Sequence, residues 1–143
     1  MTHLTHTTIL HTLIIYTFLT GILSIFCAQV GARKVYAVEA STLAKSIEQV
    51  SIENNTQDRI EVIHSKVEDI RPDSLEKVDV IVSEWMGFYL VHEGMLESVL
   101  FARDNFLHED GSLFPSVAKL YASPCQLPSM YEFWDDVCGV SMR

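Results

Sequence analysis

Several acidic residues follow apolar runs of the kind that form buried strands. Glu39 ends one run, Glu68 follows a second and Glu84 follows a third. In a doubly wound sheet, ligands bind at the carboxyl ends of the parallel strands, where a carboxylate can accept hydrogen bonds from ribose hydroxyls. One acid at a strand end is also compatible with a solvated terminus. The repetition at successive strand ends favours a site for a nucleoside cofactor.

Other chemistry-bearing residues are less informative. His3 and His6 have metal-compatible spacing, but they lie in a threonine-rich terminus without a nearby acid or cysteine, so we predict no metal site. The three cysteines are odd in number and widely spaced, which favours neither a disulfide framework nor a zinc site. His92 neighbours a further acid, Glu93, but has no identified acceptor.

The elements that must position these acids alternate between short apolar runs and helical patterns. This alternation is typical of βαβ units in a parallel sheet. Ser41 is a good N-cap for a helix over 42–54, and helical spacing predicts another over 93–107. Asp110-Gly111 then turns the chain toward extended segments. We predict a buried strand at residues 35–38, further strands at 59–64 and 78–82, and extended segments near Phe114 and Leu120-Tyr121.

The composition is that of one globular domain or of a piece of one. The chain has 143 residues, of which 48% are hydrophobic and 20% charged, with six glycines and four prolines. Disorder and collagen-like repeats are therefore excluded. The net charge of −9 opposes binding to a nucleic-acid backbone and favours cationic partners.

The N-terminal region follows a different pattern, because residues 1–32 contain no Asp, Glu, Lys or Arg. The run from Ile9 to Ala28 is about as long as the roughly 20 residues that a membrane helix needs. Residues 1–8, which precede this run, lack the positive charge of a signal peptide. Hydropathy alone leaves a membrane segment or signal, a buried strand and helix, and an extension all open.

One segment has a specific family resemblance. Ser83-Glu84-Trp85-Met86-Gly87, followed by an aromatic and apolar stretch and Glu93-Gly94-Met95-Leu96, resembles the double-glutamate loop of the protein arginine N-methyltransferases. The similarity continues in order through four other segments, so it covers about residues 20–143. These segments are 31–39, 66–68, 99–104 and 111–115. The W-M-G form of the loop is that of the members that form monomethyl and asymmetric dimethyl arginine.

The resemblance implies a partial Rossmann-like α/β methyltransferase fold that binds S-adenosyl-L-methionine. It implies that Glu84 and Glu93 are catalytic residues that hold the substrate guanidinium, with Trp85 and Met86 forming the substrate pocket. The implied substrates are arginine-containing proteins such as histones or Gly-Arg-rich proteins. The cofactor-binding residues that it implies are Thr20, Gly21, Glu39, Ala40, Val67, Glu68 and Met95.

The guanidinium group is planar and permanently charged, so its nitrogens are poor nucleophiles until they are oriented and polarised. Two carboxylates can hold this charge through charge-assisted hydrogen bonds and direct electron density toward the attacking nitrogen. One of them can also help to remove a proton. The alternative interpretation is two exposed loop glutamates beside a core tryptophan.

The resemblance also predicts the domain organisation. We expect a divergent apolar segment over 1–19, an incomplete methyltransferase core over 20–115, and the start of a β-rich barrel domain over 116–143, with the chain truncated or divergent at both ends. Of the glycine-rich turn of the family, only Thr20-Gly21-Ile22-Leu23-Ser24 is present.

The resemblance further implies a homodimer, although the dimerisation arm of the family is not among these residues, and a cytoplasmic or nuclear location. An alternative function is a non-catalytic remnant or binding module, attached to a membrane through residues 9–28. A small-molecule methyltransferase of the same fold is a further alternative, but it has no reason to carry the paired glutamates.

Overall fold

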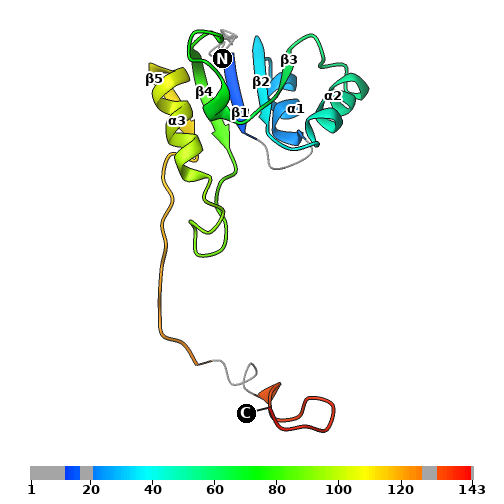
Figure 1. Ribbon diagram of the computed structural model, residues 1–143, viewed down its shortest axis with the longest axis vertical. Helices are drawn as coiled ribbons and strands as arrows, with labels where there is room; N and C mark the ends of the chain where they lie inside the picture. The colour runs from blue at the N-terminus through cyan, green and yellow to red at the C-terminus, as the bar shows by residue number, and fades with distance from the viewer. Residues whose placement is uncertain (1–11, 17–20, 127–131, 143) are drawn as a thin grey trace, which may run out of the picture.

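The structure, a computed structural model, describes residues 12–16, 21–126 and 132–142. Strands and helices alternate up to Phe114, as the βαβ pattern predicts (Figure 1). In chain order the elements are β1 (Thr12–Tyr16), α1 (Ile22–Gln29), β2 (Lys34–Glu39), α2 (Ala44–Glu53), β3 (Ile60–His64), the 3-10 helix η1 (Val67–Asp69), β4 (Val78–Ser83), α3 (Leu96–Phe106) and β5 (Leu107–Phe114).

The five strands form one parallel sheet in the order β3-β2-β1-β4-β5. The chain builds one half of the sheet outward from β1 through β2 and β3, then crosses to β4 and β5 on the other side. The strand order therefore reverses next to β1, and such a switch point is where open α/β sheets bind ligands. Tyr16, at the end of β1, pairs with Val38 on one side and Ser83 on the other.

Strand β2 shows why the sheet needs helices on both faces. Val35 and Ala37 pack with α1 and α2, whereas Tyr36 and Val38 pack with η1, β4 and α3. Successive side chains of a strand point to opposite faces, so a strand that is buried on both sides reads as a continuous apolar run. This explains why the run at 35–38 predicts the strand so directly.

The apolar run at the N-terminus contributes to the centre of this sheet. Its described residues form β1 and the eight-residue helix α1. No helix in the described ranges is both long and apolar enough to cross a membrane. Residues 1–11 and 17–20 lie outside the described residues.

Both predicted helices begin later than their sequence patterns indicate. Helix α2 begins at Ala44 because Ser41 forms a local turn, its Oγ accepting a hydrogen bond from the Leu43 N–H at 3.2 Å. Helix α3 begins at Leu96 because Gly94, with φ of +69°, has a left-handed backbone conformation that cannot continue a helix.

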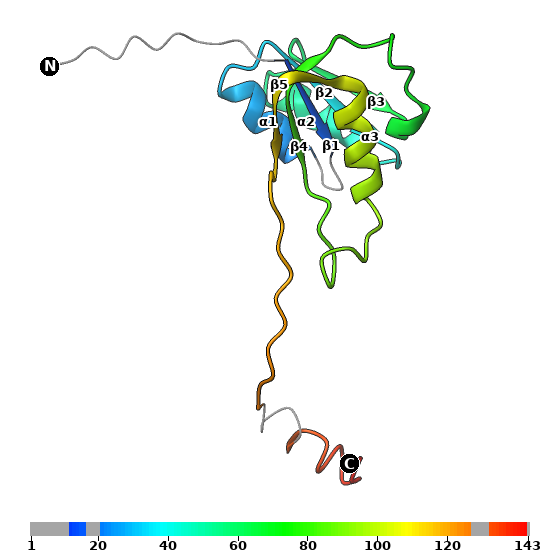
Figure 2. The ribbon, with the colours of Figure 1, turned by 90° about the vertical axis from the view of Figure 1, so that its left-hand side faces the viewer.

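The chain leaves the sheet after β5. Residues 115–126 run away from the core without strand or helix, and residues 132–142 lie apart from it (Figures 1 and 2). In this last part Phe133 and Trp134 make an edge-to-face contact at 5.1 Å, and Val137 and Val140 form an isolated bridge. The extended segment predicted near Phe114 is β5. Asp110-Gly111 lies within this strand, where the pairing with β4 is irregular. Near Leu120, where a second extended segment is predicted, the structure has no strand.

Candidate functional site

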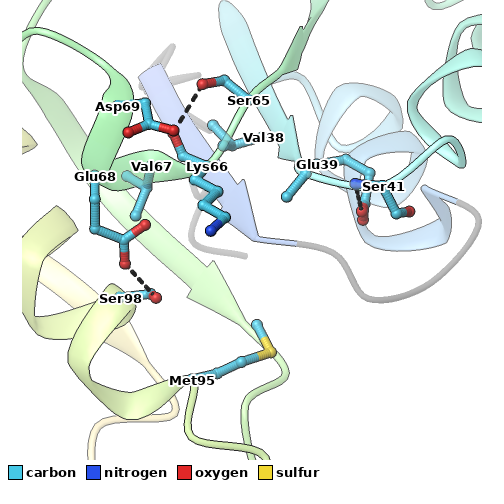
Figure 3. Close-up of a pocket in the computed structure, with 11 residues that line it drawn as sticks. Val38, Glu39, Ser41, Ser65, Lys66, Val67, Glu68, Asp69, Met95 and Ser98 are labelled. Atoms are coloured by element: carbon cyan, nitrogen blue, oxygen red, sulfur yellow. Dashed lines mark hydrogen bonds between the residues drawn. The ribbon is translucent and has the colours of Figure 1, made fainter.

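A pocket of about 630 Å³ opens at the carboxyl ends of β2 and β3 (Figure 3). Helix η1 and the start of α3 complete its wall. Its volume lies within the range of about 300–1,000 Å³ that is usual for small-molecule sites. The lining residues are Val38, Glu39, Ala40, Ser41, Ser65, Lys66, Val67, Glu68, Asp69, Met95 and Ser98.

Glu39 is the most informative of these residues because its carboxylate is buried. The residue ends β2 and is only 6% exposed. Its Oε1 accepts a hydrogen bond from the Ser41 N–H at 2.7 Å, but Oε2 is buried and no described group donates to it. A buried oxygen without a donor is costly, so this atom is suited to a ligand that brings a hydroxyl or N–H group.

Glu68 faces the same pocket from η1. Its Oε1 accepts a hydrogen bond from Ser98 Oγ, which lies on α3 (Figure 3). The neighbouring Val67 is 2% exposed and packs in the core below the pocket. The sheet and α3 therefore support this wall from beneath.

The double-glutamate loop, residues 84–95, connects β4 to α3 and projects from the sheet (Figure 1). Glu84 follows β4 directly and is partly buried, and Trp85 beside it is 8% exposed. Met86 is more open, at 37%. Trp85 thus anchors the beginning of the loop in the protein interior.

The side chain of Glu93 passes close to Gly87. A Cβ atom added at Gly87 would stand 2.4 Å from Glu93 Cγ and 3.0 Å from Glu93 Oε1. Only glycine leaves room for this approach. The turn itself is closed by two backbone hydrogen bonds between Gly87 and Leu90, at 3.1 and 2.9 Å. Glu93 is thereby brought back toward the part of the loop that contains Glu84.

The tip of the loop is apolar and open to solvent. Phe88, Tyr89 and Val91 are 78%, 84% and 61% exposed, and Phe88 contacts the His92 ring edge-on with centroids 6.4 Å apart. Tyr89 and Leu90 have positive φ values of 51° and 68°, which are uncommon for side chains of this size. Exposed apolar side chains that gather in this way typically mark a contact surface.

The predicted site residues thus fall into two neighbouring groups. Five predicted cofactor residues line the pocket, namely Glu39, Ala40, Val67, Glu68 and Met95. Gly21, the N-cap of α1, is not among the lining residues, and Thr20 lies outside the described residues. The predicted catalytic and substrate residues Glu84, Trp85, Met86 and Glu93 lie in the adjoining loop, and Met95 joins the two groups.

The pocket also contains residues that the sequence did not single out as site residues. Ser41, Ser65, Lys66 and Asp69 are chain neighbours of predicted residues, so adjacency could have identified them. Ser98 follows Met95 by three residues, a spacing that places both on one side of a helix start. A second concavity of about 880 Å³ is lined mainly by residues of β4 and β5 and contains no predicted site residue. No cluster of three or more potential metal ligands occurs within the described residues.

Comparison with known proteins shows strong similarity over most of the chain. No protein-family model matches it. It is 53% identical over 123 residues to protein arginine N-methyltransferase 6 of Danio rerio, which covers 84% of this chain and 35% of the relative. It is 49% identical over 127 residues to probable protein arginine N-methyltransferase 6.1 of Oryza sativa subsp. indica, covering 86% and 33%. The chain spans about a third of the length of these relatives.

A solved structure shares the fold. The PRMT1 enzyme–prozyme heterotetrameric complex of Trypanosoma brucei with AdoHcy superposes with a TM-score of 0.72 and 37% identity, covering 93% of this chain and 43% of that one. The parallel sheet and its helices thus have a close structural counterpart.

Proposed function

This chain belongs to the protein arginine N-methyltransferase family, and we propose that it provides the cofactor pocket and the paired glutamates for methylating arginine side chains. The observation that carries the proposal is the buried Oε2 of Glu39, to which no described residue donates a hydrogen bond, in a pocket at the switch point of the sheet. The donor that this oxygen lacks is what a ribose hydroxyl would bring.

The pocket residues fit S-adenosylmethionine, which would supply an electrophilic methyl group on its sulfonium. Glu39 would hold the ribose, with Ala40 beside it. Val67 and Glu68 would contact the adenine, and the thioether of Met95 would give an apolar contact to the ligand. Gly21 and Thr20, at the start of α1, are proposed to complete the cofactor site.

Glu84 and Glu93 would hold the substrate guanidinium. Two carboxylates can orient its planar fork through charge-assisted hydrogen bonds and keep the charge paired while a nitrogen lone pair is directed at the methyl carbon. One carboxylate then accepts the proton that the methylated nitrogen releases. Trp85 and Met86 would limit water at this point.

The proposed partners follow from charge. A net charge of −9 suits cationic, arginine-rich segments, such as those of histones or Gly-Arg-rich proteins, rather than nucleic acid. Such substrates would place the protein in the cytoplasm or nucleus. We further propose that it acts as a homodimer, that residues 20–115 belong to the methyltransferase core, and that residues 116–143 belong to a β-rich domain.

The test is transfer of a labelled methyl group from S-adenosylmethionine to a Gly-Arg-rich peptide. A matched peptide with lysine in place of every arginine is the control. We expect label in the arginine peptide and none above background in the lysine peptide. Equal labelling of both peptides would contradict the arginine clamp. The absence of label with a folded protein would leave a binding role instead of an enzymatic one.

A further inference from the structure

The segment that follows β5 has the sequence of a strand but no partner strand. Two prolines enclose residues 116–123, called here the trailing segment, which contain the β-branched Val117 and the aromatic Tyr121. In the structure this segment leaves the sheet, and no described strand pairs with it (Figures 1 and 2). The side chains of Val117, Leu120 and Tyr121 are exposed. The trailing segment therefore presents apolar side chains to solvent.

Strand β5 offers an open edge next to this segment. It is the last strand of the sheet, and among the described strands only β4 pairs with it. Phe114, at its end, is 53% exposed. The concavity of about 880 Å³ lies along the same strand, with Glu109, Asp110 and Phe114 in its lining. An open edge with exposed apolar and charged side chains can take up a further strand of complementary sequence.

We propose that this further strand is the trailing segment of a second copy of the chain, paired antiparallel with the outer edge of β5, so that two copies exchange these segments. The inference rests on the proposed homodimer, for which it names an interface. Because β5 and the trailing segment are consecutive, a two-fold axis at their junction places each trailing segment beside β5 of the other copy. Strand β5 has eight residues and 116–123 also comprises eight, so their lengths match.

The charges of the two segments are complementary. Lys119 is the only charged residue of the trailing segment, whereas Glu109 and Asp110 are adjacent in β5. All three side chains are exposed, and within the described part of the chain none of them forms an ion pair. With the axis between β5 and the trailing segment, Lys119 of one copy faces Asp110 of the other. Opposite charges placed across an antiparallel pair stabilise it.

The same register brings apolar side chains together. Val117 of one copy faces Ser112 of the other, and residues that face each other in an antiparallel pair lie on the same side of the sheet. Ser112 shares its side with Phe114, because these two residues pair with Val80 and Val82 of β4. Val117 is therefore a diagonal neighbour of Phe114. Their contact removes two exposed apolar side chains from water in each half of the dimer.

The test applies sedimentation velocity and carbodiimide cross-linking, which joins a lysine amine to a carboxylate, to the 143-residue chain. An equal mixture of unlabelled chains and chains labelled with heavy nitrogen distinguishes links within one copy from links between two. We expect a dimer at the higher protein concentrations. Peptide mass spectrometry should find links of mixed isotope composition from Lys119 to Asp110 or Glu109.

Variants outside the core of the sheet test the pairing itself. Successive backbone N–H groups of a strand point to opposite edges, so Val117→Pro/Ala118→Pro removes at least one donor to β5 and should abolish the dimer. Cys125→Pro/Gln126→Pro, beyond the paired run, is the matched control and should leave the dimer unchanged.

A charge reversal tests the register. Lys119→Glu should weaken dimerisation by about 3- to 30-fold, because it sets like charges opposite each other in both halves of the dimer. Adding Asp110→Lys to this variant should restore the dimer, which general damage to the fold would not allow. Circular dichroism checks that each variant keeps the fold of the sheet.

The contrary results are distinguishable. A dimer that persists in Val117→Pro/Ala118→Pro and gives no mixed-isotope links from Lys119 would overturn the exchange but leave the homodimer. Links from Lys119 found only within one copy would show that the trailing segment folds back on its own β5, which also overturns the exchange. A folded chain that stays monomeric at every concentration would overturn both the exchange and the homodimer. Methyl transfer is measured separately and tests the proposed activity.

Discussion

The pocket and the double-glutamate loop adjoin each other in the chain but are held in different ways. Glu39 is 6% exposed at the end of a strand that is buried on both faces, and Val38 and Val67 beside it belong to the core. In the loop, Glu93 is exposed and lies across Gly87, and the neighbouring Phe88 is 78% exposed. The sheet therefore fixes the pocket proposed for the cofactor, whereas local turn geometry fixes the loop proposed to hold the substrate. Substitutions should therefore affect the two halves separately.

The largest expected effect is on stability, and it appears when a phenylalanine is changed to alanine in the core rather than in the loop. Phe106 is fully buried in the core cluster that contains Val38 and Val67. Phe106→Ala should lower the free energy of unfolding by about 3–5 kcal/mol, because it leaves a cavity. Phe88→Ala in the loop should change it by less than about 0.5 kcal/mol. Urea denaturation followed by circular dichroism measures both, and similar losses for the two variants would remove the distinction between the regions.

The next largest effect is expected on the rate of methyl transfer, without a change in stability or cofactor affinity. Glu93→Gln should reduce methyl transfer about 100- to 1,000-fold, because a neutral amide cannot pair with the guanidinium charge as it is positioned for reaction. Glu97→Gln, on the exposed side of α3, is the matched control and should retain the rate. Affinity for S-adenosylhomocysteine should be unchanged in both variants. Undiminished transfer by Glu93→Gln would refute its assignment to the clamp.

Gly87→Ala tests the loop without changing either glutamate. The new Cβ would collide with Glu93 Cγ, so Glu93 must move. A displacement of this kind should lower methyl transfer by about 10- to 100-fold. Stability and cofactor affinity should stay near wild type, because Gly87 lies outside the core. Transfer at the wild-type rate would mean that the position of Glu93 over Gly87 is irrelevant to the reaction.

The smallest expected effect is a difference in the rate at which two cysteine thiols are alkylated. Partial burial in α1 raises the pKa of the Cys27 thiol above its ordinary value, whereas Cys125 is exposed beyond the sheet. A raised pKa means less thiolate at pH 8, so Cys27 should react with iodoacetamide about 2- to 10-fold more slowly than Cys125. Peptide mass spectrometry over time resolves the two rates. Equal rates would indicate that the sheet region opens as readily as the chain beyond it.

The sequence predicts the fold well where burial determines it. The apolar runs at 35–38 and 78–82 are strands because side chains on both faces must be covered, and no polar alternation confuses the signal. Helix starts are less predictable. Backbone conformations at Gly94 and the turn at Ser41, rather than side-chain periodicity, decide where α3 and α2 begin.

In the candidate site, too, some features could be predicted from the sequence and others could not. Glu39 and Glu68 could be predicted as pocket residues because strand ends meet at one edge of a parallel sheet. The approach of Glu93 to Gly87 and the bond from Ser98 to Glu68 could not, because both depend on how chain segments fold back on each other. The order of residue types along the chain does not indicate which distant side chains will be in contact.

The most direct test of the central claim is calorimetric titration of S-adenosylhomocysteine into the 143-residue chain. Glu39→Ala is compared with the wild type, and Glu48→Ala on the exposed side of α2 is the control. We predict saturable binding that Glu39→Ala weakens by about 1 kcal/mol or more, as loss of a charge-assisted hydrogen bond requires, and that Glu48→Ala leaves unchanged. No binding by folded wild-type protein, or equal binding by Glu39→Ala, would contradict the account.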